Sequence, residues 1–258
     1  MTAAGPTEAS AARRAELAVA LAAVEDRIMA ACNDADRSRD EITLVVVTKY
    51  FPLTDVRHLI ELGVRDVGES RAQEVVEKFD DEILRLRRVA PGEAGPLLTT
   101  HFIGQVQTNK AAAVVGWADV VHAVDRPKLV RALDRAAGAA GRSVGALIQV
   151  ALDGGKSGDG EAGARAGVRP EDADALADAV ALCPHLDLAG VMAVAPRDGD
   201  PEVAFGRLAE VSRVIMERHP DATWLSAGMS GDLEAAIRHG ATHLRVGSAI
   251  LGSRPTLR

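Results

Sequence analysis

The stretch Glu41-Ile-Thr-Leu-Val-Val-Val-Thr-Lys49 decides how the rest of the chain is interpreted. Its apolar residues follow one another with little polar alternation, which is typical of a parallel strand buried on both faces. The lysine at the end is unusual, because burial disfavours the charged form of an amine. Desolvation also makes an amine a better nucleophile toward carbonyl groups. Lys49 is therefore the first candidate for a functional residue.

The same unit, an apolar run followed by a helical segment, recurs along the chain. Strands are predicted at 42–49, 65–68, 98–103, 119–124, 144–151, 186–194, 223–226 and 243–246. Helices are predicted at 11–32, before the first strand, and then at 54–62, 70–79, 108–117, 127–140, 170–182, 201–218 and 231–239. Eight such units in 258 residues favour a closed barrel over an open doubly wound sheet.

The predicted fold class is therefore α/β, a single-domain (β/α)₈ TIM barrel with an additional N-terminal helix. We expect residues 1–10 to be disordered and residues 11–258 to form the barrel domain. A net charge of −7 gives no electrostatic footprint for nucleic acid or an anionic membrane surface. The two cysteines lack metal-ligand spacing, so no metal site is expected. Without a signal segment or a long apolar run, a cytoplasmic protein is expected.

Small and polar residues follow the last two predicted strands. Ser226-Ala-Gly-Met-Ser230 leads into a helix, whose N-terminal N–H groups favour an anion. Arg245-Val-Gly-Ser248 adds residues small enough for backbone N–H groups to approach a phosphate, with Arg245 and Gly247 on one side of the strand. A carbonyl-reactive lysine facing such a phosphate cup describes a site for a phosphorylated aldehyde. Each residue also has a purely structural alternative: Ser230 as a helix cap, Gly247 as a turn glycine, and His101 as a hydrogen-bonded core histidine.

One nucleotide-binding pattern can be set aside. Gly155-Lys156-Ser157 resembles the end of a P-loop, but the glycine required five positions earlier is Val150. The role of Lys156 in this Gly-rich loop stays open between a solvated lysine and a secondary anion contact. A G-x-G-x-x-G pattern is also missing after the first strand, so a dinucleotide fold is unsupported.

Several motifs together resemble the pyridoxal phosphate homeostasis protein family, whose members are barrels related to the N-terminal domain of alanine racemase. The resemblance covers residues 11–254 and keeps the motifs in the family's order. The motifs are Val47-Thr-Lys49, Val67-Gly-Glu-Ser70, His101-Phe-Ile-Gly-Gln-Val-Gln-Thr-Asn-Lys110, Lys156-Ser-Gly158, Gly190-Val-Met192, Leu225-Ser-Ala-Gly-Met-Ser230 and Arg245-Val-Gly-Ser-Ala-Ile-Leu-Gly252.

The resemblance implies pyridoxal 5′-phosphate (PLP) held as an aldimine on Lys49, with Arg245 near the pyridine nitrogen. It also implies that Ser226 and the Gly247–Ser248 segment bind the phosphate. This chain departs from the family at two of these positions: Ser70 stands where the family usually has Asn, and Ala227 where it usually has a larger apolar residue. The full predicted set of cofactor-binding residues is Lys49, Ser70, Met192, Ser226, Gly228, Ser230, Arg245, Gly247 and Ser248.

Turnover requires more than a cofactor. A racemase needs two acid/base groups on opposite faces of the substrate carbon. In alanine racemase the second is a tyrosine from an additional β-domain, which we do not expect here. Tyr50 is the only tyrosine, and strand alternation predicts that it points away from the Lys49 side. An arginine at the pyridine nitrogen also weakens the electron sink that carbanion chemistry needs.

The leading interpretation is a monomeric PLP carrier in intracellular vitamin B6 homeostasis, with apo PLP-dependent enzymes as recipients and little or no turnover of its own. One alternative is a PLP-dependent amino-acid racemase or aldolase in which His101 or another lysine is the second base. Another is a cofactor-free aldolase-type barrel that uses Lys49 on a sugar phosphate.

Overall fold

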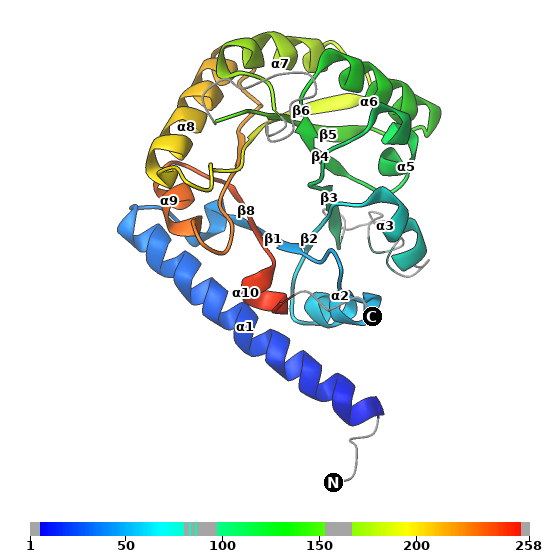
Figure 1. The fold of residues 1–258 in the computed structure, drawn as a ribbon, viewed down its shortest axis with the longest axis vertical. Coiled ribbons are helices and arrows are strands. Elements are labelled where there is room, and N and C mark those ends of the chain that lie inside the picture. Colours follow the sequence, from blue (N-terminus) through cyan, green and yellow to red (C-terminus); the bar gives the residue numbers. More distant parts are fainter. Residues whose placement is uncertain (1–5, 80–82, 84–85, 87–96, 153–166, 254–258) are drawn as a thin grey trace.

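Eight parallel strands among the described residues close into a barrel in the order in which they follow one another along the chain (Figure 1). In this computed structural model, residues 6–79, 83, 86, 97–152 and 167–253 are described. Strand β1 closes the barrel by pairing with both β2 and β8. The strands are β1 Thr43–Val47, β2 Asp66–Glu69, β3 Thr99–Phe102, β4 Val120–Val124, β5 Val144–Gln149, β6 Leu186–Met192, β7 Trp224–Ser226 and β8 His243–Val246.

Helices form a ring around these strands, as the figure shows. They are α1 Pro6–Asp34, α2 Leu53–Glu61, α3 Ala72–Lys78, α5 Ala111–Val115, α6 Pro127–Ala139, α7 Ala173–Ala181, α8 Pro201–Arg218, α9 Leu233–Arg238 and α10 Ser248–Leu251. Short 3-10 turns lie at Arg39–Glu41, Thr108–Lys110 and Pro170–Asp172. None of the helices in the described part of the chain is long and apolar enough to cross a membrane.

Two separate apolar regions hold the strands in place. The larger lies between the outward faces of the strands and the helices, and includes Leu133 and Phe205, both fully buried. The smaller lies inside the barrel, where Leu147 and Met192 pack with Val120 and Ala123. Aliphatic residues make up most of both regions, which agrees with an aromatic content of only 3%.

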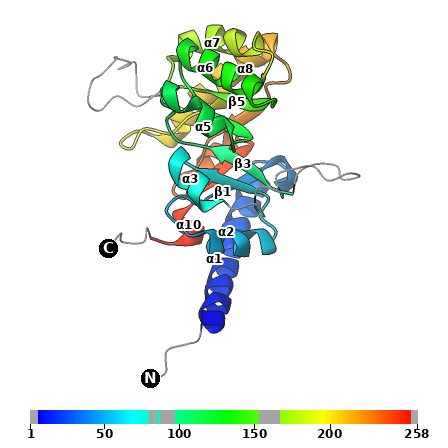
Figure 2. The ribbon, with the colours of Figure 1, turned by 90° about the vertical axis from the view of Figure 1, so that its right-hand side faces the viewer.

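Helix α1 lies outside the barrel, alongside α2, α9 and α10, and its first turns extend beyond the other elements (Figures 1 and 2). It begins at Pro6, five residues before the predicted start at residue 11, so residues 6–10 are helical where disorder was predicted. Arg13 fixes it to the barrel by donating to the buried Asp55 carboxylate of α2 (2.8 Å) and to the Leu251 carbonyl of α10 (3.0 Å). The expected extra N-terminal helix is therefore an integral part of the wall.

The predicted strands coincide with the observed ones, although many strand ends are shorter by one or two residues and β2 extends one residue further than predicted. The predicted helix at 108–117 is divided into a 3-10 turn and α5, and α10 was not predicted. The Gly-rich loop with Lys156 lies outside the described residues, as does most of the 80–96 connection. The predicted single-domain barrel with an additional N-terminal helix is confirmed.

Candidate functional site

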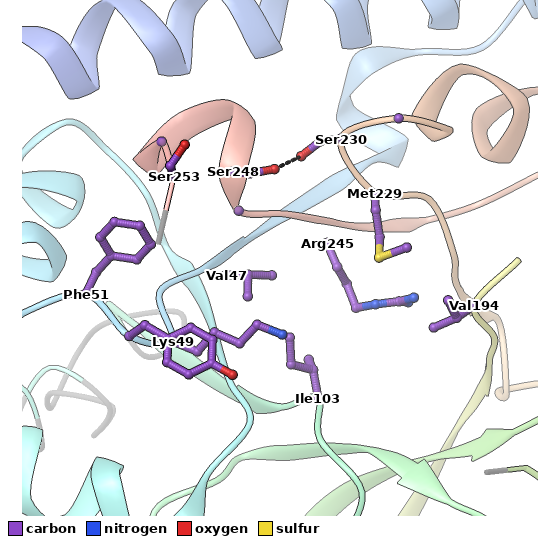
Figure 3. A pocket seen from close by; sticks show the side chains of 14 residues that line it. Val47, Lys49, Phe51, Ile103, Val194, Met229, Ser230, Arg245, Ser248 and Ser253 are labelled. Carbon is purple, nitrogen blue, oxygen red and sulfur yellow. Dashed lines mark hydrogen bonds between the residues drawn. The ribbon is translucent and has the colours of Figure 1, made fainter. Parts of the chain in front are cut away.

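A cavity of about 470 Å³ opens at the carboxyl ends of the strands, where barrel active sites are found (Figure 3). Residues following β1, β3, β6, β7 and β8 contribute to it, so its wall is assembled from the whole length of the chain. The residues that line it are Val47, Lys49, Tyr50, Phe51, Ile103, Val194, Met229, Ser230, Gly231, Arg245, Gly247, Ser248, Gly252 and Ser253.

Lys49 follows β1 by two residues, and its amine points into the cavity beside Ile103 (Figure 3). Its side chain is half-buried, so the amine is less enclosed than the apolar run before it suggested. A buried cluster fixes the preceding residue: the Glu69 carboxylate accepts from the Thr48 hydroxyl (2.7 Å) and from the Lys78 amine (2.7 Å). Lys78 also donates to the Thr48 carbonyl (3.0 Å), so three side chains hold the backbone next to Lys49.

Tyr50 lies where the sequence argument did not place it. The strand has ended at Val47, and Tyr50 adopts a left-handed conformation with φ of 70°. Strand alternation therefore does not apply, and Tyr50 lines the same cavity as Lys49. The Lys49 amine is 6.0 Å from the centre of the tyrosine ring. The prediction that Tyr50 points away from the lysine side is wrong.

The predicted phosphate cup is assembled in part. Ser230 and Ser248 line the cavity with Gly231 and Gly247, and the Ser248 hydroxyl donates to the Ser230 oxygen (3.3 Å). Arg27 of α1 supports the Ser230 loop, because it donates to the Ser230 carbonyl (3.1 Å) and forms an ion pair with Glu234. The two serines and the adjacent glycine backbone can therefore offer hydroxyl and N–H donors to one anionic group.

Arg245 brings a buried cation to the cavity (Figure 3). Its guanidinium donates to the Ser226 hydroxyl oxygen (2.6 Å) and to the Ala193 carbonyl (2.8 Å). Burial lowers the pKa of Arg245 to about 10, and the carboxylate of Asp232 opposes that shift. A pKa of about 10 still leaves the guanidinium charged at neutral pH.

Four predicted cofactor-binding residues lie outside the cavity wall. Ser226 is fully buried behind Arg245, and Met192 belongs to the apolar cluster inside the barrel. Gly228 has φ of 88°, and a Cβ there would lie 2.7 Å from the Ala236 side chain, so its glycine serves packing. Ser70 is half-buried and is not among the lining residues. The predicted residues that do line the cavity are Lys49, Ser230, Arg245, Gly247 and Ser248.

The barrel interior also holds a polar chain, of which the sequence indicated His101 and Ser226 but neither Asp66 nor His122. His101 is fully buried and bonded at both ring nitrogens, to Asp66 (2.9 Å) and to His122 (2.9 Å). His122 in turn lies 3.0 Å from the Ser226 hydroxyl. Burial lowers the pKa of His122 well below the usual value, with the neighbouring His101 adding to the shift. A histidine in the middle of an apolar β4 was the available sequence signal.

A third histidine, His243, lies beside this chain. Its ring stacks on Trp224 at 3.9 Å, and its Nδ1 is 2.8 Å from the Thr242 hydroxyl. Burial lowers the pKa of His243 to about 3, with smaller contributions from His101 and Arg245. The interior therefore contains at least two neutral imidazoles at neutral pH.

Comparison with known proteins identifies the family of this chain. The family model for the N-terminal domain of alanine racemase matches residues 19–255. The pyridoxal phosphate homeostasis protein of Mycobacterium tuberculosis (strain ATCC 25618 / H37Rv) is 42% identical over 248 residues, which cover 94% of each chain. This chain belongs to the pyridoxal phosphate homeostasis protein family. The homologue in Escherichia coli (strain K12) is 35% identical over 246 residues, covering 93% of this chain and 97% of the homologue.

Solved structures of similar proteins have the same barrel. PipY of Synechococcus elongatus PCC7942, whose structure with PLP bound is known, is 29% identical with a TM-score of 0.73, over 92% of this chain and 100% of PipY. Alanine racemase of Clostridium difficile 630 is 13% identical with a TM-score of 0.63, and the match covers 90% of this chain but 58% of the racemase. At that identity the racemase supports the fold alone. This chain therefore shares its barrel fold with alanine racemase.

Proposed function

We propose that this chain binds PLP as an aldimine on Lys49 and holds it for release in vitamin B6 homeostasis, with little or no turnover of its own. The observation that carries the proposal is that Lys49, Arg245 and the Ser230–Ser248 pair line one cavity. The chemistry of this donor set matches the cofactor: an amine for the aldehyde, a cation for the ring, and hydroxyl and N–H donors for the phosphate. PipY, a structural neighbour, has been seen with PLP bound.

The positive charge of Arg245 supports a protein that holds PLP over one that uses PLP for catalysis. Bound PLP supplies an electron sink whose strength depends on a proton at its ring nitrogen. A guanidinium that stays charged has hydrogen-bond donors but no acceptor, so it disfavours that proton. Ser226 and Ala193 fix the guanidinium in place. The arrangement favours retention of an aldehyde and weakens carbanion chemistry.

The proposal is tested by incubating the protein with PLP, recording the visible spectrum, reducing with borohydride and locating the added mass by mass spectrometry. We expect an absorption band from a lysine Schiff base and a mass increase on the peptide with Lys49. Lys49→Arg keeps the charge but cannot form the bond, so the band should disappear.

Lys128→Arg is the matched control, because Lys128 is an exposed lysine on α6, away from the cavity. It should give the band and the mass of the unaltered protein. A colourless protein, or a label on lysines other than Lys49, contradicts the proposal. If borohydride reduction fixes a sugar phosphate to Lys49 instead of PLP, the result favours the cofactor-free aldolase alternative.

Tyr50 is the observation that favours a second candidate, a PLP-dependent racemase or aldolase. It lines the cavity together with Lys49 and supplies a second group able to exchange a proton. His101, the base considered from the sequence, is fully buried and bonded at both nitrogens, so it is poorly placed for this role. Solvent deuterium incorporation at Cα of an amino-acid panel, lost in Tyr50→Phe, favours the enzyme; incorporation no faster than with free PLP favours the carrier.

The proposal extends to the setting of the protein: a cytoplasmic monomer that passes PLP to apo PLP-dependent enzymes. Light scattering of the PLP-loaded protein should give the mass of one 27.0 kDa chain. Reactivation of an apo-enzyme should proceed faster from the loaded protein than from the same concentration of free PLP mixed with Lys49→Arg. Equal rates contradict direct delivery.

A further inference from the structure

A chain of hydrogen bonds crosses the inside of the barrel and ends at the cavity. It runs from Asp66 of β2 to His101 of β3 (2.9 Å), then to His122 of β4 (2.9 Å), and on to Ser226 of β7 (3.0 Å). Since β4 and β7 are not neighbours in the sheet, the last bond must span the interior. Arg245 completes the chain by donating to the Ser226 oxygen (2.6 Å).

The two ends of this chain, together with a single proton on each of the two imidazole rings, fix the direction of every bond in it. An ionised Asp66 carboxylate can only accept, so the proton on His101 lies at Nε2. If this is the only proton on the His101 ring, its Nδ1 is an acceptor, and His122 must donate from its Nε2. At the other end, the guanidinium of Arg245 can only donate, and it donates to the Ser226 oxygen.

The remaining bond follows from the state of His122. This ring is fully buried and its pKa lies well below the usual value, so it carries one proton, already assigned to Nε2. Its Nδ1 is therefore an acceptor, and the Ser226 hydroxyl donates to it. All bonds then point the same way, from the buried cation Arg245 to the carboxylate Asp66.

This order assigns Ser226 a role different from phosphate binding. Its hydroxyl proton is committed to His122, its oxygen receives Arg245, and its side chain is fully buried. Ser226 therefore has no proton to offer a ligand in the cavity. Ser226 can influence that ligand only through the Arg245 guanidinium, which donates to its oxygen.

The far end of the chain is open to solvent. Asp66 keeps 22% of its side chain exposed and lines a second cavity of about 340 Å³ at the amino ends of the strands. Glu25, Arg39 and Arg65 line the same cavity, and His243 and Asp232 are the other titratable groups close to the chain. Asp66, at the opposite end of the barrel, is thus connected by hydrogen bonds through His101, His122 and Ser226 to Arg245, which lines the proposed cofactor cavity.

We propose that Asp66, His101 and His122 are positioning residues that act on bound PLP through Ser226 and Arg245, holding the guanidinium in one orientation against the cofactor ring. This inference rests on the proposed function for its ligand, whereas the direction of the bonds is a property of the protein alone. The two are tested separately.

The direction of the chain is tested without cofactor. Nitrogen-15 NMR of the unliganded protein at neutral pH, with two-bond proton–nitrogen correlations, reports which ring nitrogen carries the proton. We expect Nε2–H for both His101 and His122. A proton on Nδ1 of His122, or averaging between the two forms, overturns the order of bonds even if PLP binds to Lys49.

The effect on the cofactor is tested with Asp66→Ala in the PLP-loaded protein. This substitution removes the carboxylate that accepts from His101, so the His101 and His122 rings are no longer held in one orientation. We therefore expect the affinity for PLP to fall about three- to tenfold. The pH midpoint of the Schiff-base absorption band should move by at least about half a unit. Borohydride should still attach PLP to Lys49, because the lysine itself is unchanged.

Asp178→Ala is the matched control. Asp178 pairs with His219 at 2.8 Å, a similar carboxylate–imidazole pair on the outside of the barrel. This variant should keep the affinity and the midpoint of the unaltered protein. Identical behaviour of Asp66→Ala and Asp178→Ala overturns the positioning role. If Asp66→Ala does not fold, Asp66→Leu, which also lacks an acceptor, gives the same comparison, and a midpoint unchanged in that variant is equally decisive against the positioning role.

Discussion

The region outside the barrel strands and the region inside them are built differently. Between strands and helices the packing is a large apolar layer that includes Leu133 and Phe205. Inside, an apolar cluster with Leu147 and Met192 fills one part, while histidines and Arg245 occupy another. Because the outer layer buries most of the apolar surface, the interior can hold polar groups that cost stability. Folding and the proposed placement of the cofactor therefore depend on separate layers.

The largest expected effect comes from the outer layer. Phe205→Ala removes a fully buried ring of α8 and leaves a cavity, so unfolding free energy should fall by about 3–5 kcal/mol. Urea unfolding measures the loss. The control is Val203→Ala on the same helix, whose side chain is 53% exposed and should change little. A lost Schiff-base band in the folded fraction of Phe205→Ala would contradict the separation of layers.

The second effect comes from the interior histidines and depends on pH. The pKa of His243 is about 3 in the fold, against about 6.5 in the unfolded chain, and that of His122 is also lowered. Between these values the unfolded chain binds more protons, so stability falls as the pH drops below about 6.5. Each group contributes up to about 1.4 kcal/mol per pH unit.

Urea unfolding at several pH values between 7 and 4 measures this slope. His243→Gln removes one of the two groups, so its stability should depend less steeply on pH than that of the unaltered protein. Equal slopes would show that the interior imidazoles are not held neutral. The outer layer and the interior would then not differ in how their contribution to stability depends on pH.

The smallest effect is expected at Met192. Met192→Leu conserves volume within the interior apolar cluster, so unfolding free energy should change by less than about 1.5 kcal/mol. Because Met192 does not line the cavity, the affinity for PLP should stay the same. Fluorescence or absorbance titration with PLP measures this, and a weaker affinity would restore Met192 to the cofactor-binding residues.

The sequence predicted the barrel well because buried parallel strands leave continuous apolar runs, such as Ile42–Val47, that need no knowledge of distant contacts. Positions at or just beyond the carboxyl ends of strands were predicted for the same reason, and Lys49, Arg245 and Gly247 line the cavity together. Features that depend on the three-dimensional path of the backbone were not predicted from the sequence. The left-handed turn at Tyr50 reversed its expected direction.

Ser226 illustrates a second limit of the sequence. A serine at a strand end before a glycine is indistinguishable in sequence from a phosphate ligand. Its place behind Arg245 follows from His122, which is 104 residues earlier in the chain and three strands away in the barrel. Side-chain pairs that cross the interior leave no local pattern, so only the fold reveals them.

The closure of the barrel by β1 and β8 has a consequence for synthesis of the chain. Lys49 follows the first strand, and Arg245 belongs to the last, to which the first is paired. While the protein is being made, the lysine therefore leaves the ribosome nearly two hundred residues before its partner cation. The cavity exists only after the final strand has joined the first, so a nascent chain cannot capture an aldehyde in it before the barrel is complete.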